Sequence, residues 1–295
     1  MEPVEVRRAS RQSLRDIADR LRAGFPRYAL RMLGLALPLV VWNLLAHYLA
    51  SNTKGASIIL PTIEQVVREG IPGFSAFWQG GGRSVATGQS NIVESLQVLA
   101  LHSAISSARL LVGVLLGILV GIGIGLIMGW SRRLRSIFYP AIEVIRISPL
   151  LAFMPLFILW FGGSETSRIF YILFGAAIVM IAYTNNAIEN VHPMYVQFAR
   201  TLGASRTRVY QTVVLPAIVP ELVAGIRVAI GLGWALTLGA EFMTAQAGLG
   251  RLMLLAEIWG LTDRIIVIAF LFMAYAFVLD QLFVGLSRRV TRWKP

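Results

Sequence analysis

Few ionisable side chains lie inside the long apolar segments of this sequence, and these are the groups with the clearest chemical potential. Arg227 lies about ten residues into an apolar segment that starts near Ala217, roughly 15 Å along a helix. A charge at that position is costly unless it is paired or faces water. Two interpretations follow: Arg227 faces a polar path and favours an anion, or it forms an ion pair with Glu143.

Other ionisable residues lie nearer to the ends of their apolar segments. For these we expect pairing between packed helices, or a side chain that extends to the membrane surface. They are Glu143, Arg146, Glu221 and Asp280.

Residue patterns that support catalysis are not found. The two lysines, Lys54 and Lys294, do not occur in a G-x-x-x-x-G-K-[ST] loop, so the chain has no phosphate cradle of that type. The histidines His47, His102 and His192 lack zinc-site spacing, and we interpret them as interfacial or loop residues. Cysteine is absent. We therefore expect no catalytic residues, no metal and no cofactor on this chain, and an intramembrane enzyme lacks a nucleophile, base or metal set.

Composition places the chain in a membrane. Of its 295 residues, 56% are hydrophobic and only 14% are charged, which a soluble globular chain does not show. The net charge of +12 does not indicate nucleic-acid binding, because arginines that flank membrane helices mark cytoplasmic segments.

The apolar segments predict an all-α membrane protein with six transmembrane helices. Residues 1–30 form a cytoplasmic segment with an amphipathic helix at 7–25, and residues 31–295 form the transmembrane domain. An external loop with short helices is expected at 51–103. The six spans are expected near residues 31–50, 106–130, 137–161, 168–184, 217–240 and 264–286.

Lysine and arginine are concentrated in alternate connecting segments. These are residues 1–31, 131–135, 185–215 and 287–295. By the positive-inside rule, both termini and the segment 185–215 are cytoplasmic.

Glycines recur every four residues in the second predicted span. Such a ridge lets another helix approach closely, which favours internal helix packing over the alternative of a sliding surface for motion. The glycines are Gly113, Gly117, Gly121, Gly125 and Gly129.

The segment between the fourth and fifth spans has the pattern of two short helices. Tyr195, Phe198, Ala199 and Leu202 have the spacing of one helical face. Gly203 suits the position after a helix end, where a residue in the left-handed conformation closes the turn. Ser205 is a cap for a second helix that runs to about Leu215, and Pro216 either ends it or opens the next segment.

This segment resembles the EAA motif of ABC importer permeases, with Gln197 and Phe198 in place of the motif's Glu and first Ala. The matching positions are Gln197, Phe198, Ala199, Leu202, Gly203, Leu215 and Pro216. The resemblance continues through Ser148–Ile169, Gly225–Phe242 and Ala247–Asp263. It covers roughly residues 95 to 290 and is similar to the nitrate, taurine and aliphatic sulfonate branch of that family.

The resemblance implies a type I ABC importer permease fold in a prokaryotic inner membrane. ATP and Mg²⁺ are then expected on separate ATPase subunits, with a second permease copy, as in a homodimer, and an extracytoplasmic substrate-binding protein as further partners. Glu241, Gly248 and Gly250 are implied at the outer gate. The residues expected to couple with the ATPase, in cytoplasmic helices at 190–215 and just after them, are Tyr195, Gln197, Phe198, Ala199, Leu202, Gly203, Ala204, Val209, Leu215 and Pro216.

The expected function is the permease subunit of an ATP-driven, binding-protein-dependent importer for a small anion such as a sulfonate, taurine or nitrate. The alternative is a stand-alone ion-coupled carrier. That class uses carboxylates near the midplane and often inverted repeats, and neither is evident here.

Overall fold

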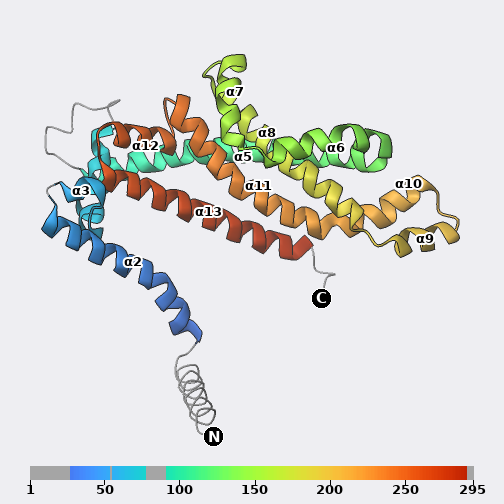
Figure 1. Ribbon diagram of the computed structural model, residues 1–295, viewed down its shortest axis with the longest axis horizontal. Helices are drawn as coiled ribbons and strands as arrows, with labels where there is room; N and C mark the ends of the chain where they lie inside the picture. The colour runs from blue at the N-terminus through green and yellow to red at the C-terminus, as the bar shows by residue number, and fades with distance from the viewer. Residues whose placement is uncertain (1–26, 54, 78–90, 291–295) are drawn as a thin grey trace, which may run out of the picture. The chain divides into compact units, whose positions relative to one another are not determined.

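The structure is a computed structural model that describes residues 27–53, 55–77 and 91–290. These residues form helices and the turns that connect them (Figure 1). Two units, residues 1–65 and residues 66–295, are described separately. Within the described ranges, five helices are long and apolar enough to cross a membrane, and a bent pair of shorter helices raises the number to six. The predicted all-α membrane architecture is confirmed.

The first unit contains the first predicted span. Its helices are α2 (Arg27–Asn52), α3 (Ala56–Ile59) and α4 (Ile63–Gln65). Trp42 Nε1 donates to the carbonyl oxygen of Pro61 at 3.1 Å and so ties the chain after α2 back to that helix. The amphipathic helix predicted at 7–25 lies outside the described residues.

Four long helices form the body of the second unit and run side by side in Figure 1. They are α5 (Ile92–Trp130), α8 (Glu165–Glu189), α11 (Leu215–Thr244) and α13 (Thr262–Val290). The shorter α12 (Leu249–Ile258) connects the last two. α8 packs against both α5 and α11, and α11 packs against α13.

α5 is longer than the sequence predicted. It begins at Ile92, where the side chain of Asn91 accepts from the N–H of Val93 at 3.0 Å, rather than near Ser106. Residues 92–103, expected in a loop, are therefore helical. Its 39 residues extend roughly 58 Å, well beyond a hydrocarbon core of about 30 Å.

The segment before α5 contains the short helices that we expected. They are a π-helical turn η1 (Val66–Gly70) and a 3₁₀ helix η2 (Pro72–Phe77). Ser95 Oγ of α5 donates to the carbonyl oxygen of Pro72 at 2.5 Å and accepts from the N–H of Ser75 at 2.8 Å. η2 is thereby held on the first turns of α5.

The third predicted span is not one continuous helix. Instead, α6 (Arg132–Ile147) is followed by a 3₁₀ turn η4 (Leu150–Phe153) and α7 (Met154–Phe161), with a bend of 100° between the two parts. The break falls at Ser148 and Pro149. Proline has no N–H to donate and disfavours helical backbone in the residue before it, and Ser148 is extended.

The glycine ridge of α5 packs against α8. A Cβ added at Gly121 would lie 2.5 Å from the Cβ of Met180, and one at Gly117 would lie 2.6 Å from the Cβ of Ala176. The residues of α8 that face the ridge also recur every four positions: Ile172, Ala176, Met180, Thr184 and Ile188. The prediction of internal helix packing is confirmed.

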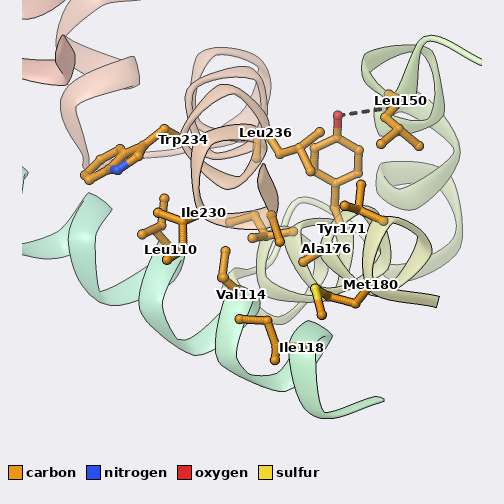
Figure 2. Close-up of a cluster of buried hydrophobic side chains, with 14 of the residues drawn as sticks. Leu110, Val114, Ile118, Leu150, Tyr171, Ala176, Met180, Ile230, Trp234 and Leu236 are labelled. Atoms are coloured by element: carbon orange, nitrogen blue, oxygen red, sulfur yellow. Dashed lines mark hydrogen bonds between the residues drawn. The ribbon is translucent and has the colours of Figure 1, made fainter. Parts of the chain in front are cut away.

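Beside the ridge, large apolar side chains from three long helices form the main core of the second unit (Figure 2). Leu110 and Val114 of α5 point toward α11. Tyr171 of α8 is fully buried and donates to the carbonyl oxygen of Leu150 at 3.2 Å, which ties the turn η4 to the core.

We expect Gly121→Ala to lower the free energy of unfolding by about 1–3 kcal/mol, because the added methyl group forces α5 and α8 apart. Gly123→Ala is the matched control, since a Cβ at Gly123 meets no atom within 4 Å. Alanine favours a helix more than glycine does, so the control is expected to be neutral or slightly stabilising. Thermal unfolding of both variants in one detergent checks this, and equal shifts would contradict it.

Candidate functional site

Two short helices follow α8 at one end of the second unit (Figure 1). α9 spans Pro193–Thr201 and α10 spans Arg206–Val209. His192 Nδ1 accepts from the N–H of Met194 at 3.2 Å and caps α9. Ser205 Oγ caps the first turn of α10. The predicted helix pair and the predicted cap at Ser205 are confirmed.

Gly203 closes the turn between the two helices. Its φ is +81°, a left-handed conformation that disfavours any side chain. Its N–H donates to the carbonyl oxygen of Arg200 at 2.9 Å, and the N–H of Ala204 donates to that of Ala199 at 3.1 Å. These bonds form a Schellman motif, which satisfies the last carbonyls of a helix. The predicted turn at Gly203 is confirmed, and it sets the angle between α9 and α10.

α9 presents an exposed apolar face. Phe198 is 65% exposed and Leu202 is 73% exposed, and Met194 and Tyr195 lie on the same short helix and are also exposed. Gln197 is exposed beside them. Exposed apolar side chains that are rimmed by polar residues are typical of a protein interaction site.

The helix pair is anchored to the end of α5. Arg206 Nη2 donates to the carbonyl oxygen of Trp130, and the guanidinium lies 4.7 Å from the centre of the Trp130 ring. Tyr210 packs edge-on against the same ring at 5.1 Å and donates to the carbonyl oxygen of Leu126 at 2.9 Å. Arg206 and Tyr210 therefore hold the helix pair, and with it the apolar face of α9, on the end of α5.

Two predicted coupling residues face inward instead. Val209 is buried and lines a small cavity with Ile188 of α8 and Val196 of α9, so its side chain is not part of the exposed face of α9, and its coupling role stays a prediction. Leu215 packs against a small buried cluster that consists of Ala187, Val214 and Ile218. Arg206 and Arg208 of α10 are exposed, and Val209 is the buried residue of that short helix.

Pro216 opens the next helix. α10 continues through a π-helical turn η5 (Tyr210–Val214) into α11. Pro216 lies in the first turn of α11, where proline is readily accommodated. Pro216 therefore opens the next helix rather than ending the one before it.

A second group of candidates surrounds Glu241, whose side chain is fully buried near the end of α11. Its carboxylate accepts from Ser106 Oγ at 2.8 Å, from Arg109 Nη1 at 2.7 Å and from the N–H of Gly250 at 2.9 Å. A buried carboxylate requires such compensation for its lost hydration. α5 thus supplies both side-chain partners of a charge carried by α11.

Arg109 connects this carboxylate to a second one. Its Nε and Nη2 donate to the two oxygens of Glu165 at 2.6 Å each, and Nη1 also donates to the carbonyl oxygen of Ala247 at 2.6 Å. Arg168 Nη1 donates to Glu165 at 2.7 Å. Two guanidinium groups and two carboxylates from α5, α8 and α11 therefore balance each other. We call Arg109, Glu165, Arg168 and Glu241 the ion cluster.

The turn between α11 and α12 packs directly on Glu241. Gly248 has a φ of +124°, and a Cβ there would lie 2.4 Å from Cδ of Glu241. A Cβ at Gly250 would lie 2.6 Å from the Cβ of Glu241. His102 Nδ1 of α5 accepts from the N–H of Gly248 at 2.9 Å, so His102 joins a helix to a turn and is not a loop residue. The structure thus brings together Glu241, Gly248 and Gly250, the three residues that the resemblance implied at the outer gate.

Sequence reasoning missed Arg109, Glu165 and Arg168. The available indication was that Arg109 directly precedes an uncharged stretch that runs to Trp130. Its two carboxylate partners lie 56 and 132 residues further along the chain, so only the tertiary fold identifies them.

Arg227 and Glu143, which we considered as a pair, have other partners. Arg227 donates through Nε and Nη2 to both carboxylate oxygens of Asp280 at 2.7 Å each. Glu143 accepts from Arg146 of the same helix at 3.0 Å. The predicted Arg227–Glu143 ion pair is wrong, because α13 packs along α11 and places Asp280 beside Arg227.

We expect Glu241→Gln to lower the free energy of unfolding by about 3–5 kcal/mol, because Arg109 keeps a buried charge without one of its partners. Glu143→Gln is the matched control: that carboxylate belongs to an exposed pair, and the expected change is about 1 kcal/mol or less. Thermal unfolding in detergent measures both. Similar shifts for the two variants would show that the ion cluster does not hold the helices together.

Comparisons with known proteins agree with this geometry. Residues 113–292 match the family of "Binding-protein-dependent transport system inner membrane component". The chain is 35% identical to the taurine transport system permease protein TauC of Escherichia coli K12 over 194 residues, or 65% of this chain and 70% of TauC. It is 33% identical to SsuC of the same organism, a permease protein named for aliphatic sulfonates, over 86% of this chain and 88% of SsuC.

A solved structure shows the same fold. A chain of the MetNI methionine ABC transporter, in an inward-facing conformation, superposes with a TM-score of 0.54 at 17% identity, covering 63% of this chain and 93% of that one. The spans, the helix pair and these matches lead to one conclusion. This chain belongs to the family of inner membrane components of binding-protein-dependent transport systems, and it is a permease subunit of an ABC importer with the type I fold.

Proposed function

We propose that this permease imports a small oxyanion, either a sulfonate such as taurine or an inorganic anion such as nitrate. The names of the two relatives, one for taurine and one for aliphatic sulfonates, support the sulfonate class. The family assignment supports an importer over a stand-alone carrier.

ATP hydrolysis takes place on separate ATPase subunits in this proposal, and those subunits hold ATP and Mg²⁺. Neither lysine of this chain occurs in a phosphate-binding loop. The observation that carries the proposal is the exposed apolar face of α9, with Tyr195, Phe198 and Leu202. A short helix with such a face fits an apolar groove on a partner.

The contact with the ATPase has to be rigid to be effective. Reversing a two-state equilibrium from 99:1 to 1:99 requires about 5.5 kcal/mol of differential binding. The Gly203 turn and the stacking of Arg206 on Trp130 support such transmission, because they hold α9 and α10 at a set angle on α5.

The remaining partners follow from the same proposal. A second copy of the chain completes the translocation path as a homodimer, with both termini and the helix pair in the cytoplasm. The distribution of arginines and lysines supports that orientation. The turn around Gly248 and Gly250, which packs on Glu241, then lies at the outer end, where the substrate-binding protein docks.

We expect Gly203→Val to insert in the membrane yet lose ATP-driven uptake. Gly260→Val is the matched control, since Gly260 has a φ of +66° and the same two hydrogen bonds of a Schellman motif, at the end of α12. Neither glycine has an atom within 4 Å of an added Cβ, so both variants carry a similar left-handed strain of about 1–2 kcal/mol. Only Gly203→Val is expected to lose the ATPase subunit on purification, whereas Gly260→Val is expected to retain it. Normal uptake by Gly203→Val would contradict the coupling role.

A tagged chain purified in mild detergent is expected to co-purify with ATPase subunits, one for each copy of the permease. Phe198→Asp is expected to remove the ATPase, because it places a charge in the apolar face. Thr207→Asp, at an exposed polar position of α10, adds the same charge and is expected to retain it. A chain that purifies alone and moves solute into liposomes without ATP would support the carrier alternative instead.

A further inference from the structure

The Arg227–Asp280 pair has an unusual position. Both residues lie inside long apolar helices. Arg227 is about 18 Å from the start of α11 and about 26 Å from its end. A charged pair at such a depth is costly against hydrocarbon.

The pair is nevertheless exposed on the second unit. The Arg227 side chain is 49% exposed and that of Asp280 is 30% exposed. The ion cluster, by contrast, buries Arg109 and Glu241. Lipid tails are therefore poor neighbours for the charged pair itself, whereas water suits it. The exposed residues Phe277 and Met273, about one and two turns before Asp280 on α13, are apolar.

The other side of the same two helices is apolar. A groove of about 230 Å³ between α5, α11 and α13 is lined by apolar side chains, among them Leu110, Val114, Ile226, Ile230 and Leu279. Figure 2 shows Ile230 on the side of α11 that faces Leu110 and Val114. Arg227 follows Ile226 by one position, about 100° around the helix, and its guanidinium is directed to Asp280.

Small residues lie next to Arg227 on the exposed side of α11. Ala224, Gly231 and Ala235 are exposed, and a Cβ added at Gly231 meets no atom within 4 Å. Small side chains of α11, rather than bulky ones, therefore lie one turn away from Arg227 on either side.

We infer that Arg227 binds the anionic group of the substrate, and that this group replaces the carboxylate of Asp280 while the substrate passes. A guanidinium donates two parallel N–H bonds to two oxygens. Asp280 occupies both donors now, and a sulfonate offers the same pair of oxygens. Asp280 neutralises Arg227 when no substrate is present, and its return releases the anion. This inference rests on the proposed function and adds a residue and a ligand group to it.

The natural absence of cysteine allows a direct test of water access. Ala224→Cys and Gly231→Cys, each in the full transporter in proteoliposomes, are expected to react with a charged, membrane-impermeant methanethiosulfonate. Taurine is expected to slow that reaction. Leu119→Cys is the control on an exposed apolar position of α5 and is expected to stay unlabelled. If both α11 positions stay unlabelled, lipid or protein covers this side and the inference fails.

A charge exchange separates anion binding from a merely structural pair. The double variant Arg227→Asp with Asp280→Arg keeps an ion pair between α11 and α13 but moves the cation to the other helix. We expect its thermal unfolding to match the unmodified protein, while taurine transport at subsaturating concentration falls about ten- to hundredfold, the usual effect of losing a charged hydrogen-bond partner. Full recovery of transport would show that the pair only joins the helices.

The failure of this inference is distinguishable from that of the proposed function. If the unmodified transporter moves taurine or nitrate and the exchanged variant does so equally well, only the role of Arg227 is lost. If the unmodified transporter moves neither anion but carries a neutral or cationic solute, the anion proposal itself is lost. Asp280→Asn adds a positive expectation, since removing the competing carboxylate is expected to lower the KM for taurine.

Discussion

The close approach of α5 and α8 is the contact on which the rest of the second unit depends. Five glycines at four-residue spacing face side chains of α8 at the same spacing, and even a methyl group would collide at Gly121. Within lipid, helices gain little from the hydrophobic effect, so dispersion contacts between closely packed backbones hold them together. α5 and α8 therefore behave as one body, against which α11 packs.

This body carries two candidate sites, one near the middle of α5 and one at the C-terminal end of that helix. Ser106 and Arg109 of α5 hold Glu241 and the turn before α12. About 32 Å further along the helix, Trp130 supports the short helix pair. One continuous helix thus links the ion cluster to the segment that offers an apolar face to a partner.

Local features were predictable from the sequence. The turn at Gly203, the cap at Ser205 and the glycine ridge depend on residues within one or two turns of each other, and all three were found where expected. The break in the third span was missed because hydropathy is continuous over 137–161, although Ser148 followed by Pro149 marks the position. The partners of Arg109 and Arg227 depend on how distant helices pack, and no local pattern records that. The burial of Val209, which lines a cavity with Ile188 of α8, likewise depends on a neighbour distant in the sequence.

The π-helical turn at Tyr210–Val214 makes α10 and α11 a single run of helix from Arg206 to Met243. Tyr210, bonded to Leu126 and packed on Trp130, and Arg206, which also contacts Trp130, hold the start of this run on the end of α5. Near the other end of the run, about 47 Å further along, Glu241 is bonded to Ser106 and Arg109 of the same helix. Two ties to α5, at widely separated points, therefore make it hard for the run to move without α5.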